Sequence, residues 1–338
     1  ITVTAAPAFN SSQATEGSIF LALVGEKTDG HKFVSDAFAH GAVLAFVTSE
    51  VPERCIVVKD VLAALNSLAS YGRQALPELK VIALTGSQGK TTTKDLLRQI
   101  LETVAPTVAP AGNFNNELGA PITLLQCDEK TRFCILEMGA RHVGDIAKLC
   151  KMATPDIGVV LRVGTAHVGE FGSEELVAKA KSEMISSLPD SAISVLGQYD
   201  KYTPAMASLH NGTTVTFGET TSSDVRATDI EIREGRPHFD LVTPAGRASV
   251  ALRIIGIENF PLNTIEIYNR YGTLVWKNSN YNNKTVVFNG KANVSGVVSK
   301  DSFLPSGTYF FVLKYPNYCK QTQLKGFINI EKSKIIIS

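Results

Sequence analysis

The residues with the clearest chemical potential form a glycine-rich segment directly after an apolar run. They are Thr85, Gly86, Ser87, Gln88, Gly89, Lys90, Thr91 and Thr92. Glycines let backbone N–H groups close around phosphate oxygens, and the start of a following helix adds positive potential. Lys90 can reach the outer phosphates, and the Thr91 hydroxyl can ligate magnesium. We therefore predict a site for the phosphates of a nucleotide and for Mg²⁺. The motif has the short T-G-x-x-G-K-T form, because Leu84 replaces the first glycine of the longer motif.

One carboxylate farther along the chain could complete this site. Glu137 ends the apolar run Phe133–Glu137. Open α/β sheets bind ligands at the carboxyl ends of their strands, and magnesium prefers hard oxygen ligands. The alternative is a glutamate that caps a helix or forms a salt bridge.

Two basic residues are weaker candidates on their own. His167 follows a run of small residues and could be an ordinary loop histidine. Lys181 lies in a segment of helical period, where a solvated lysine is the default interpretation.

The surrounding segments indicate the elements that position these groups. Short β-branched runs alternate with helical stretches, which is typical of an α/β fold with a parallel sheet. We expect strands at 81–84, 133–137 and 157–161, and helices at 92–101, 143–152 and 174–185. A smaller α/β unit precedes them, with strands at 19–24 and 43–47, a helix at 32–40 and a linker at 75–78 that contains Pro77. After residue 191 the pattern changes to strands, at 213–217, 225–232 and 248–254.

The last quarter of the chain has a different composition. Residues 255–338 hold one alanine and eleven asparagines, against 31 and six in residues 1–254. They carry ten basic and four acidic residues, whereas the first part carries 23 and 28. Short strands at 264–269, 273–277, 285–288, 308–314 and 326–330, separated by Asn-, Gly- and Pro-rich turns, predict a small β-sandwich.

Four strings resemble the Mur ligases, the ATP-dependent amide-forming enzymes of peptidoglycan precursor synthesis, and in particular those that add D-alanyl-D-alanine. The strings are the phosphate loop, residues 112–121 (GNFNNELGAP), residues 137–146 (EMGARHVGDI), and residues 163–167 with 180–183 (VGTAH, AKSE). Residues 17–23 and 25–33 look like the same enzymes' uridine-nucleotide domain, although Asn10-Ser11-Ser12 stands where the family usually has Asp-Ser-Arg.

The resemblance implies roles for named residues. Two magnesium ions would be held by Thr91, Glu137, His167 and Lys181, with Lys181 carbamylated by carbon dioxide. The carbamate requires a neutral amine and therefore a depressed lysine pKa. Catalysis would involve Lys90, Lys181, His167, Asn116 and Glu117, with Asn113 nearby.

The implied reaction joins D-alanyl-D-alanine to UDP-N-acetylmuramoyl-tripeptide through an acyl phosphate. The implied domains are a uridine-nucleotide domain over 1–77, with its start truncated, and an incomplete phosphate-loop ATPase domain over 78–256. After residue 256 the family would continue with an Asn/Ala-rich helix and a third domain. Since neither follows, we expect impaired ligation.

Residues 257–338 instead resemble the gliding-motility-associated C-terminal domain of Bacteroidetes surface proteins, a type IX secretion signal. The resemblance rests on the strings at 267–272 (IYNRYG) and 307–313 (GTYFFVL). A ligase part would be cytoplasmic, whereas this domain alone would imply export to the cell surface. A natural or artefactual fusion that acts as a surface-targeted protein is therefore the alternative function, and another phosphate-loop NTPase is the third.

Overall composition excludes several other classes. The formal net charge is +1 and 44% of residues are hydrophobic, so neither disorder nor a basic nucleic-acid surface is expected. No window is apolar enough for a membrane span, and no signal peptide is visible. Five scattered cysteines predict reduced thiols rather than disulfides or a zinc site.

Overall fold

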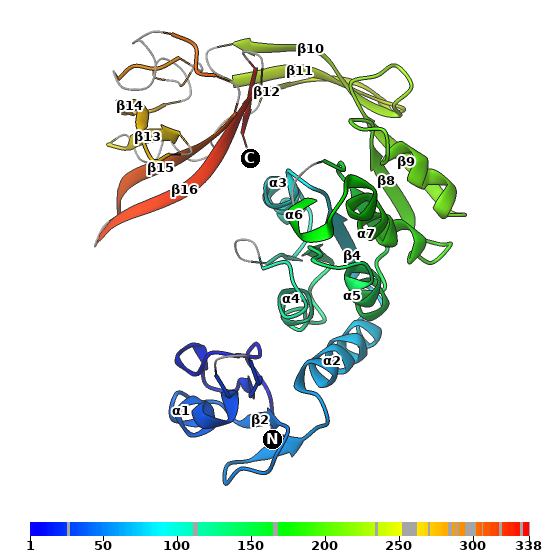
Figure 1. The fold of residues 1–338 in the computed structure, drawn as a ribbon, viewed down its shortest axis with the longest axis vertical. Helices are drawn as coiled ribbons and strands as arrows, with labels where there is room; N and C mark the ends of the chain where they lie inside the picture. The colour runs from blue at the N-terminus through cyan, green and yellow to red at the C-terminus, as the bar shows by residue number, and fades with distance from the viewer. Residues whose placement is uncertain are drawn as a thin grey trace. The chain divides into compact units, whose positions relative to one another are not determined.

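The chain consists of two compact units, which are described separately. The computed structural model describes residues 1–25, 28–110, 114–164, 168–233, 236–251, 262–269, 271–282, 286, 288, 291–294, 302–305, 307–317, 320–331 and 334–337. The first unit is Ile1–Thr216 and the second is Phe217–Ser338. Figure 1 shows the order of helices and strands along the chain.

The first unit begins with a three-stranded parallel sheet of order β1-β2-β3. Its strands are β1 (Ile19–Leu21), β2 (Leu44–Val47) and β3 (Cys55–Val57), with the helical elements η1 (Ser11–Gln13), η2 (Gly30–Phe33) and α1 (Val34–Ala39). β1 and β2 are buried along their whole length, which explains their continuous apolar sequences. The predicted small α/β unit is confirmed.

Helix α2 (Val61–Ala75) follows, and we did not predict it. The Asp60 carboxylate caps it by accepting a hydrogen bond from Ala63 N at 2.9 Å. Its buried residue Leu65 belongs to the same apolar cluster as Ile19 and Leu21, whereas Ala69 belongs to the core of the larger sheet. The helix therefore joins the two sheets through continuous packing.

The larger sheet of the first unit has the order β9-β8-β7-β4-β6-β5. Its strands are β4 (Lys80–Thr85), β5 (Thr107–Val108), β6 (Phe133–Glu137), β7 (Ile157–Val160), β8 (Ile193–Gly197) and β9 (Thr213–Gly218). The intervening helical elements are α3 (Lys90–Glu102), α4 (Gly119–Leu124), α5 (Asp145–Ala153), α6 (Val168–Phe171), α7 (Glu174–Ser186) and η3 (Pro204–Leu209). Strands β4 to β8 pair in parallel, with β4 between β6 and β7. The loops that follow these three strands therefore lie at one edge of the sheet.

The second unit begins with an antiparallel meander. It consists of β10 (Val225–Arg233), β11 (Arg236–Thr243) and β12 (Gly246–Ala251). The predicted domain boundary at residue 256 falls in 252–261, outside the described residues, so it remains a prediction.

A five-stranded antiparallel sheet of order β14-β13-β15-β16-β17 follows. Its strands are β13 (Thr264–Asn269), β14 (Leu274–Ser279), β15 (Gly307–Asn317), β16 (Lys320–Glu331) and β17 (Lys334–Ile337). Ile265, Ile267, Trp276 and Leu313 form much of its core. The described residues form one antiparallel sheet here. Residues 285 and 287 of the predicted strand at 285–288 lie outside the description, so the sandwich stays a prediction.

Two general expectations concern cysteines and membranes. Cys55, Cys127, Cys134 and Cys150 are free thiols, and Cys319 lies outside the described residues. Within the described ranges, no helix combines the length and the apolar character needed to cross a membrane.

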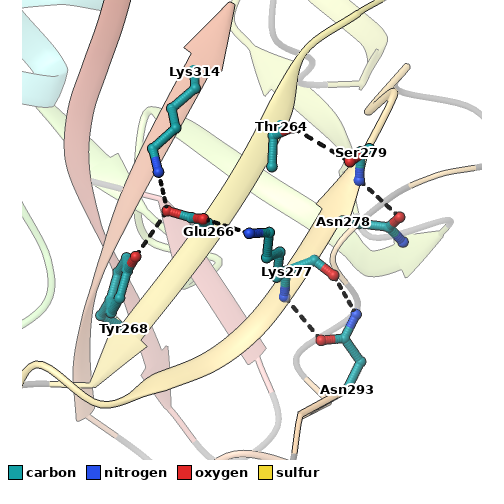
Figure 2. Close-up of polar contacts among 8 residues, drawn as sticks. All are labelled: Thr264, Glu266, Tyr268, Lys277, Asn278, Ser279, Asn293 and Lys314. Atoms are coloured by element: carbon teal, nitrogen blue, oxygen red, sulfur yellow. Dashed lines mark hydrogen bonds and ion pairs between the residues drawn. The ribbon is translucent and has the colours of Figure 1, made fainter.

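A buried carboxylate on β13 connects three strands of this sheet (Figure 2). Glu266 accepts hydrogen bonds from Tyr268 Oη at 2.8 Å and Lys314 Nζ at 2.7 Å, and it pairs with Lys277 Nζ at 2.9 Å. These contacts, led by Lys314, hold the pKa of Glu266 at about 2, below its ordinary value of 4.5. Asn293 binds the backbone N and O of Lys277 and so satisfies the edge of β14.

Acidification should selectively destabilise this sheet. Because the pKa of Glu266 is lower in the folded protein, its stabilisation is complete above pH 4.5 and is lost as the pH falls towards 2. Both lysines are partly exposed to solvent, so we expect the contribution to be only about 1–3 kcal/mol. Urea unfolding followed through Trp276, the single tryptophan, measures it. Glu266→Gln should remove this pH dependence, whereas Glu219→Gln, at an exposed site, should retain it. Equal pH profiles for the two variants would refute the assignment.

Candidate phosphate and magnesium site

The glycine-rich loop joins β4, the central strand, to α3. Gly89 has φ +81°, a left-handed conformation that favours glycine, and it immediately precedes the first residue of the helix. A Cβ at Gly86 would lie 3.0 Å from Leu161 Cβ, so a side chain there would press on the segment after β7. Ser87 N donates to Arg162 O at 2.9 Å, and Ser87 Oγ accepts from Gly164 N at 2.9 Å. The loop is thereby fixed against the end of β7.

Lys90 bends back over this loop. Its Nζ donates a hydrogen bond to Gly86 O at 2.9 Å. Burial lowers the pKa of Lys90, and the nearby charge of Glu137 partly offsets this effect. Thr85 at the start of the loop is fully buried, and its Oγ1 has no hydrogen-bond partner within the described residues. An unsatisfied hydroxyl and a partly desolvated ammonium fit a loop that takes an anionic ligand.

Thr91 and Glu137 meet at the carboxyl ends of β4 and β6. Thr91 Oγ1 donates to Glu137 Oε2 at 3.1 Å, and Glu137 is 1% exposed. Neighbouring ligands of an octahedral magnesium ion lie about 2.9 Å apart, since each is about 2.0–2.1 Å from the metal. The two oxygens therefore have the chemistry and the spacing for one Mg²⁺, with Lys90 beside them.

Glu137 does not cap a helix, and its second carboxylate oxygen also accepts a hydrogen bond. Asn115 Nδ2 donates to Glu137 Oε1 at 2.8 Å. Sequence reasoning did not select Asn115. Three asparagines lie in residues 113–116, and spacing alone could not decide which of them turns towards the carboxylate.

Lys181 is buried on α7, with 4% exposure, so it is not the solvated lysine of the default interpretation. Burial, together with the positive charge of Lys90, lowers its pKa to about 7. Two residues later, Glu183 accepts hydrogen bonds from Gly144 N at 2.5 Å and Ala147 N at 3.0 Å. This contact fixes α7 against the start of α5. Because its pKa is about 7, Lys181 has a substantial neutral fraction near pH 7.

Other predicted residues lie elsewhere or outside the description. Asn116 is exposed, and its Oδ1 accepts from Gly119 N at 3.0 Å and Leu118 N at 3.3 Å, which caps the start of α4. Glu117 is exposed, and so is Gln88 in the phosphate loop. His167 and Asn113 fall outside the described residues, where no placement is given. Among described residues, no group of three His, Cys, Asp or Glu side chains could hold a metal ion. The second predicted magnesium site remains a prediction.

The Asp29-Gly30-His31 string forms an ordered turn. His31 Nε2 accepts from Thr48 N at 2.9 Å, so its Nδ1 carries the proton and lies 2.6 Å from Asp29 Oδ1. Asn10 caps η1 by accepting from Ser12 N at 3.1 Å. The departure from Asp-Ser-Arg at residues 10–12 therefore preserves the local cap.

Two family models match the chain. The Mur ligase middle domain matches residues 84–265, and the CHU_C Type IX secretion signal domain matches residues 238–330. The two matches overlap over residues 238–265.

Curated relatives and solved structures match about three quarters of the chain. UDP-N-acetylmuramoyl-tripeptide--D-alanyl-D-alanine ligase of Mycobacterium tuberculosis H37Rv is 40% identical over 278 residues, covering 75% of this chain and 54% of the relative. MurF from Acinetobacter baumannii is 38% identical with TM-score 0.68, covering 75% and 56%. MurF ligase from Thermotoga maritima, in complex with ADP, is 31% identical with TM-score 0.66, covering 74% and 58%. The chain thus spans about half the length of the curated relatives it matches.

Proposed function

The chain belongs to the Mur ligase family, and on this premise we propose that its first 256 residues carry the ATP and uridine-nucleotide sites of a ligase that joins D-alanyl-D-alanine to UDP-N-acetylmuramoyl-tripeptide. The curated relatives that are named for this activity support the proposal. Such a ligase part would act in the cytoplasm, in peptidoglycan precursor synthesis.

The proposed reaction has two steps. The terminal carboxylate of the tripeptide attacks the γ-phosphorus of ATP, which releases ADP and gives an acyl phosphate. The amine of D-alanyl-D-alanine then attacks the acyl carbon, loses a proton and expels phosphate. Lys90 and the backbone N–H groups of the loop offset the charge on the transferred phosphoryl group. Thr91 and Glu137 would hold a magnesium ion, which supplies further charge neutralisation when bound.

Lys181 has the environment that the proposed carbamate requires. A neutral amine can attack carbon dioxide and lose a proton, which converts the uncharged side chain into an anionic carbamate. Lys90, whose charge lowers the pKa of Lys181, would then attract the product. With His167, this anion would complete a second magnesium site.

The observation that carries the proposal is the contact between Thr91 and Glu137 at the start of the phosphate-loop helix. Lys90→Ala should weaken Mg²⁺-dependent binding of a fluorescent ATP analogue by about 10–100-fold, because charge-assisted hydrogen bonds contribute about 1.5–3 kcal/mol. The matched control is Lys80→Ala, at an exposed lysine on β4 that pairs with Asp156. Unchanged affinity in Lys90→Ala, or no Mg²⁺ dependence in the wild type, would overturn the proposal.

The type IX match supports a second function for the C-terminal part, export to the cell surface. The full chain should then reach the surface of a bacterium with a type IX secretion system and remain inside an otherwise identical strain without one. Equal retention in both strains would rule out a sorting role and leave the ligase proposal untouched.

A further inference from the structure

Phe114 connects the start of the chain to the phosphate site. Its ring stacks on Phe9, with centroids 5.9 Å apart and planes inclined by 15°. Phe114 also packs against the apolar cluster that contains Ile19, Leu21 and Leu65. Stacked aromatic pairs contribute about 0.5–1.5 kcal/mol beyond area burial. The segment at Phe114 is therefore held by residues of the small N-terminal sheet and its surroundings.

The next residue, Asn115, forms hydrogen bonds with both chain neighbours of Met138, which are Glu137 and Gly139. Its backbone O accepts from Gly139 N at 2.7 Å, and its side-chain Nδ2 donates to Glu137 Oε1 at 2.8 Å. A Cβ at Gly139 would lie 3.2 Å from Asn115 Oδ1, so the glycine permits this close approach. Asn115 cannot shift without moving or releasing the Glu137 carboxylate.

The rotation of the Glu137 carboxylate decides which of its two oxygens faces the Thr91 hydroxyl. Terminal sp³–sp² torsions have broad energy wells, so a glutamate carboxylate rotates easily unless both oxygens are held. Here Asn115 holds Oε1, and Oε2 lies 3.1 Å from Thr91 Oγ1. Together with the Thr91 hydroxyl, the Asn115 amide therefore fixes which carboxylate oxygen is available to a cation beside Thr91.

We propose that Asn115 is a positioning residue that orients Glu137 for magnesium, and that the Phe9–Phe114 stack sets the position of Asn115 from the N-terminal sheet. The inference rests on the proposed function, because it assumes a magnesium–nucleotide complex at the loop. Its consequence is a mechanical link: a displacement of the uridine-nucleotide domain changes the affinity of the phosphate site for Mg²⁺.

The test is a Mg²⁺ titration of fluorescent ADP binding to the full chain. Asn115→Leu should raise the half-saturating Mg²⁺ concentration by about 10-fold, while nucleotide affinity at saturating Mg²⁺ changes less than about threefold. Phe9→Ala should raise it by about three- to fivefold, and Phe9→Tyr, which keeps the ring, should restore the wild-type value. In the double variant the effects should not add, because both act through Glu137.

Phe38→Ala is the matched control, since Phe38 packs in the N-terminal core without a ring contact to Phe114. Phe38→Ala should leave the half-saturating Mg²⁺ concentration unchanged. This control separates a general destabilisation of the N-terminal core from the specific effect of the Phe9–Phe114 stack. Equal midpoints in wild type and Asn115→Leu would overturn the positioning role while Mg²⁺-dependent binding persists. Absence of Mg²⁺-dependent binding in the wild type would remove the proposed function and this inference together.

Discussion

Lys181→Met is expected to reduce D-alanyl-D-alanine-dependent phosphate release by about 10²–10³-fold in a version of this enzyme completed with a MurF C-terminal part. This is the usual cost of removing one preorganised charged group from an active site. Nucleotide binding should change much less, because in the proposed site Lys90 and the loop, not Lys181, would bind the phosphates. Methionine preserves the volume of this buried side chain but cannot form a carbamate. Short carboxylates such as acetate should partly restore the rate by replacing the missing anion.

The pKa of Lys181, about 7, gives this prediction a pH dependence. Only the neutral amine reacts with carbon dioxide, so the carbamylated fraction at fixed carbon dioxide should fall as the pH drops below 7. NMR with ¹³C-bicarbonate should detect a carbamate in the wild type and in Lys179→Met, an exposed control on the same helix, but not in Lys181→Met. Full activity of Lys181→Met in carbon-dioxide-depleted buffer would exclude the role.

The phosphate loop was predictable because its determinants are local. Gly89 is required by the left-handed turn before the helix, and Lys90 and Thr91 follow in fixed positions on that helix. Only Gly86 depends on a distant segment, through its close approach to Leu161. The strand Phe133–Glu137 was predicted with its observed bounds, since a continuous run of four apolar residues before Glu137 is typical of a buried strand. The burial of Lys181 could also have been predicted from the helical period. Val177 and Met184, four residues before it and three after it, are apolar and are buried on the same face of the helix.

The remaining errors arise where tertiary contacts decide. The Asn-rich string could not show that Asn115 would face Glu137 while Asn116 caps α4, because both amides make the same kinds of hydrogen bond. Helix α2 was missed although Asp60 and its spaced Leu and Ala residues are a start signal and an apolar face. β11 was missed because it alternates imperfectly, and its pairing with β10 shifts register between Thr228 and Glu231.

The C-terminal unit is the part of the chain whose replacement should matter most for ligation. Residues 238–330 match a secretion-signal domain, and the chain covers only 56% of the Acinetobacter baumannii MurF chain. The segment contains four acidic residues, and Glu266 is already committed to Lys277 and Lys314. It therefore offers few groups that could clamp a nucleotide ribose or a dipeptide amine.

Exchanging residues 257–338 for the corresponding C-terminal portion of Acinetobacter baumannii MurF should raise D-alanyl-D-alanine-dependent phosphate release by about 10²-fold or more. Holding the reactants in the right orientation lowers the activation free energy by about 7–11 kcal/mol relative to free reactants. About a quarter of that lowering already corresponds to a roughly 10²-fold higher rate. The exchanged protein carrying Lys90→Ala should lose the gain, because the rate must still depend on the phosphate loop of this chain. Comparable rates from the 338-residue chain and the exchanged protein would show that residues 1–256 orient both substrates by themselves, and the acyl-phosphate chemistry would then have to be explained from β4, α3, β6 and α7 alone.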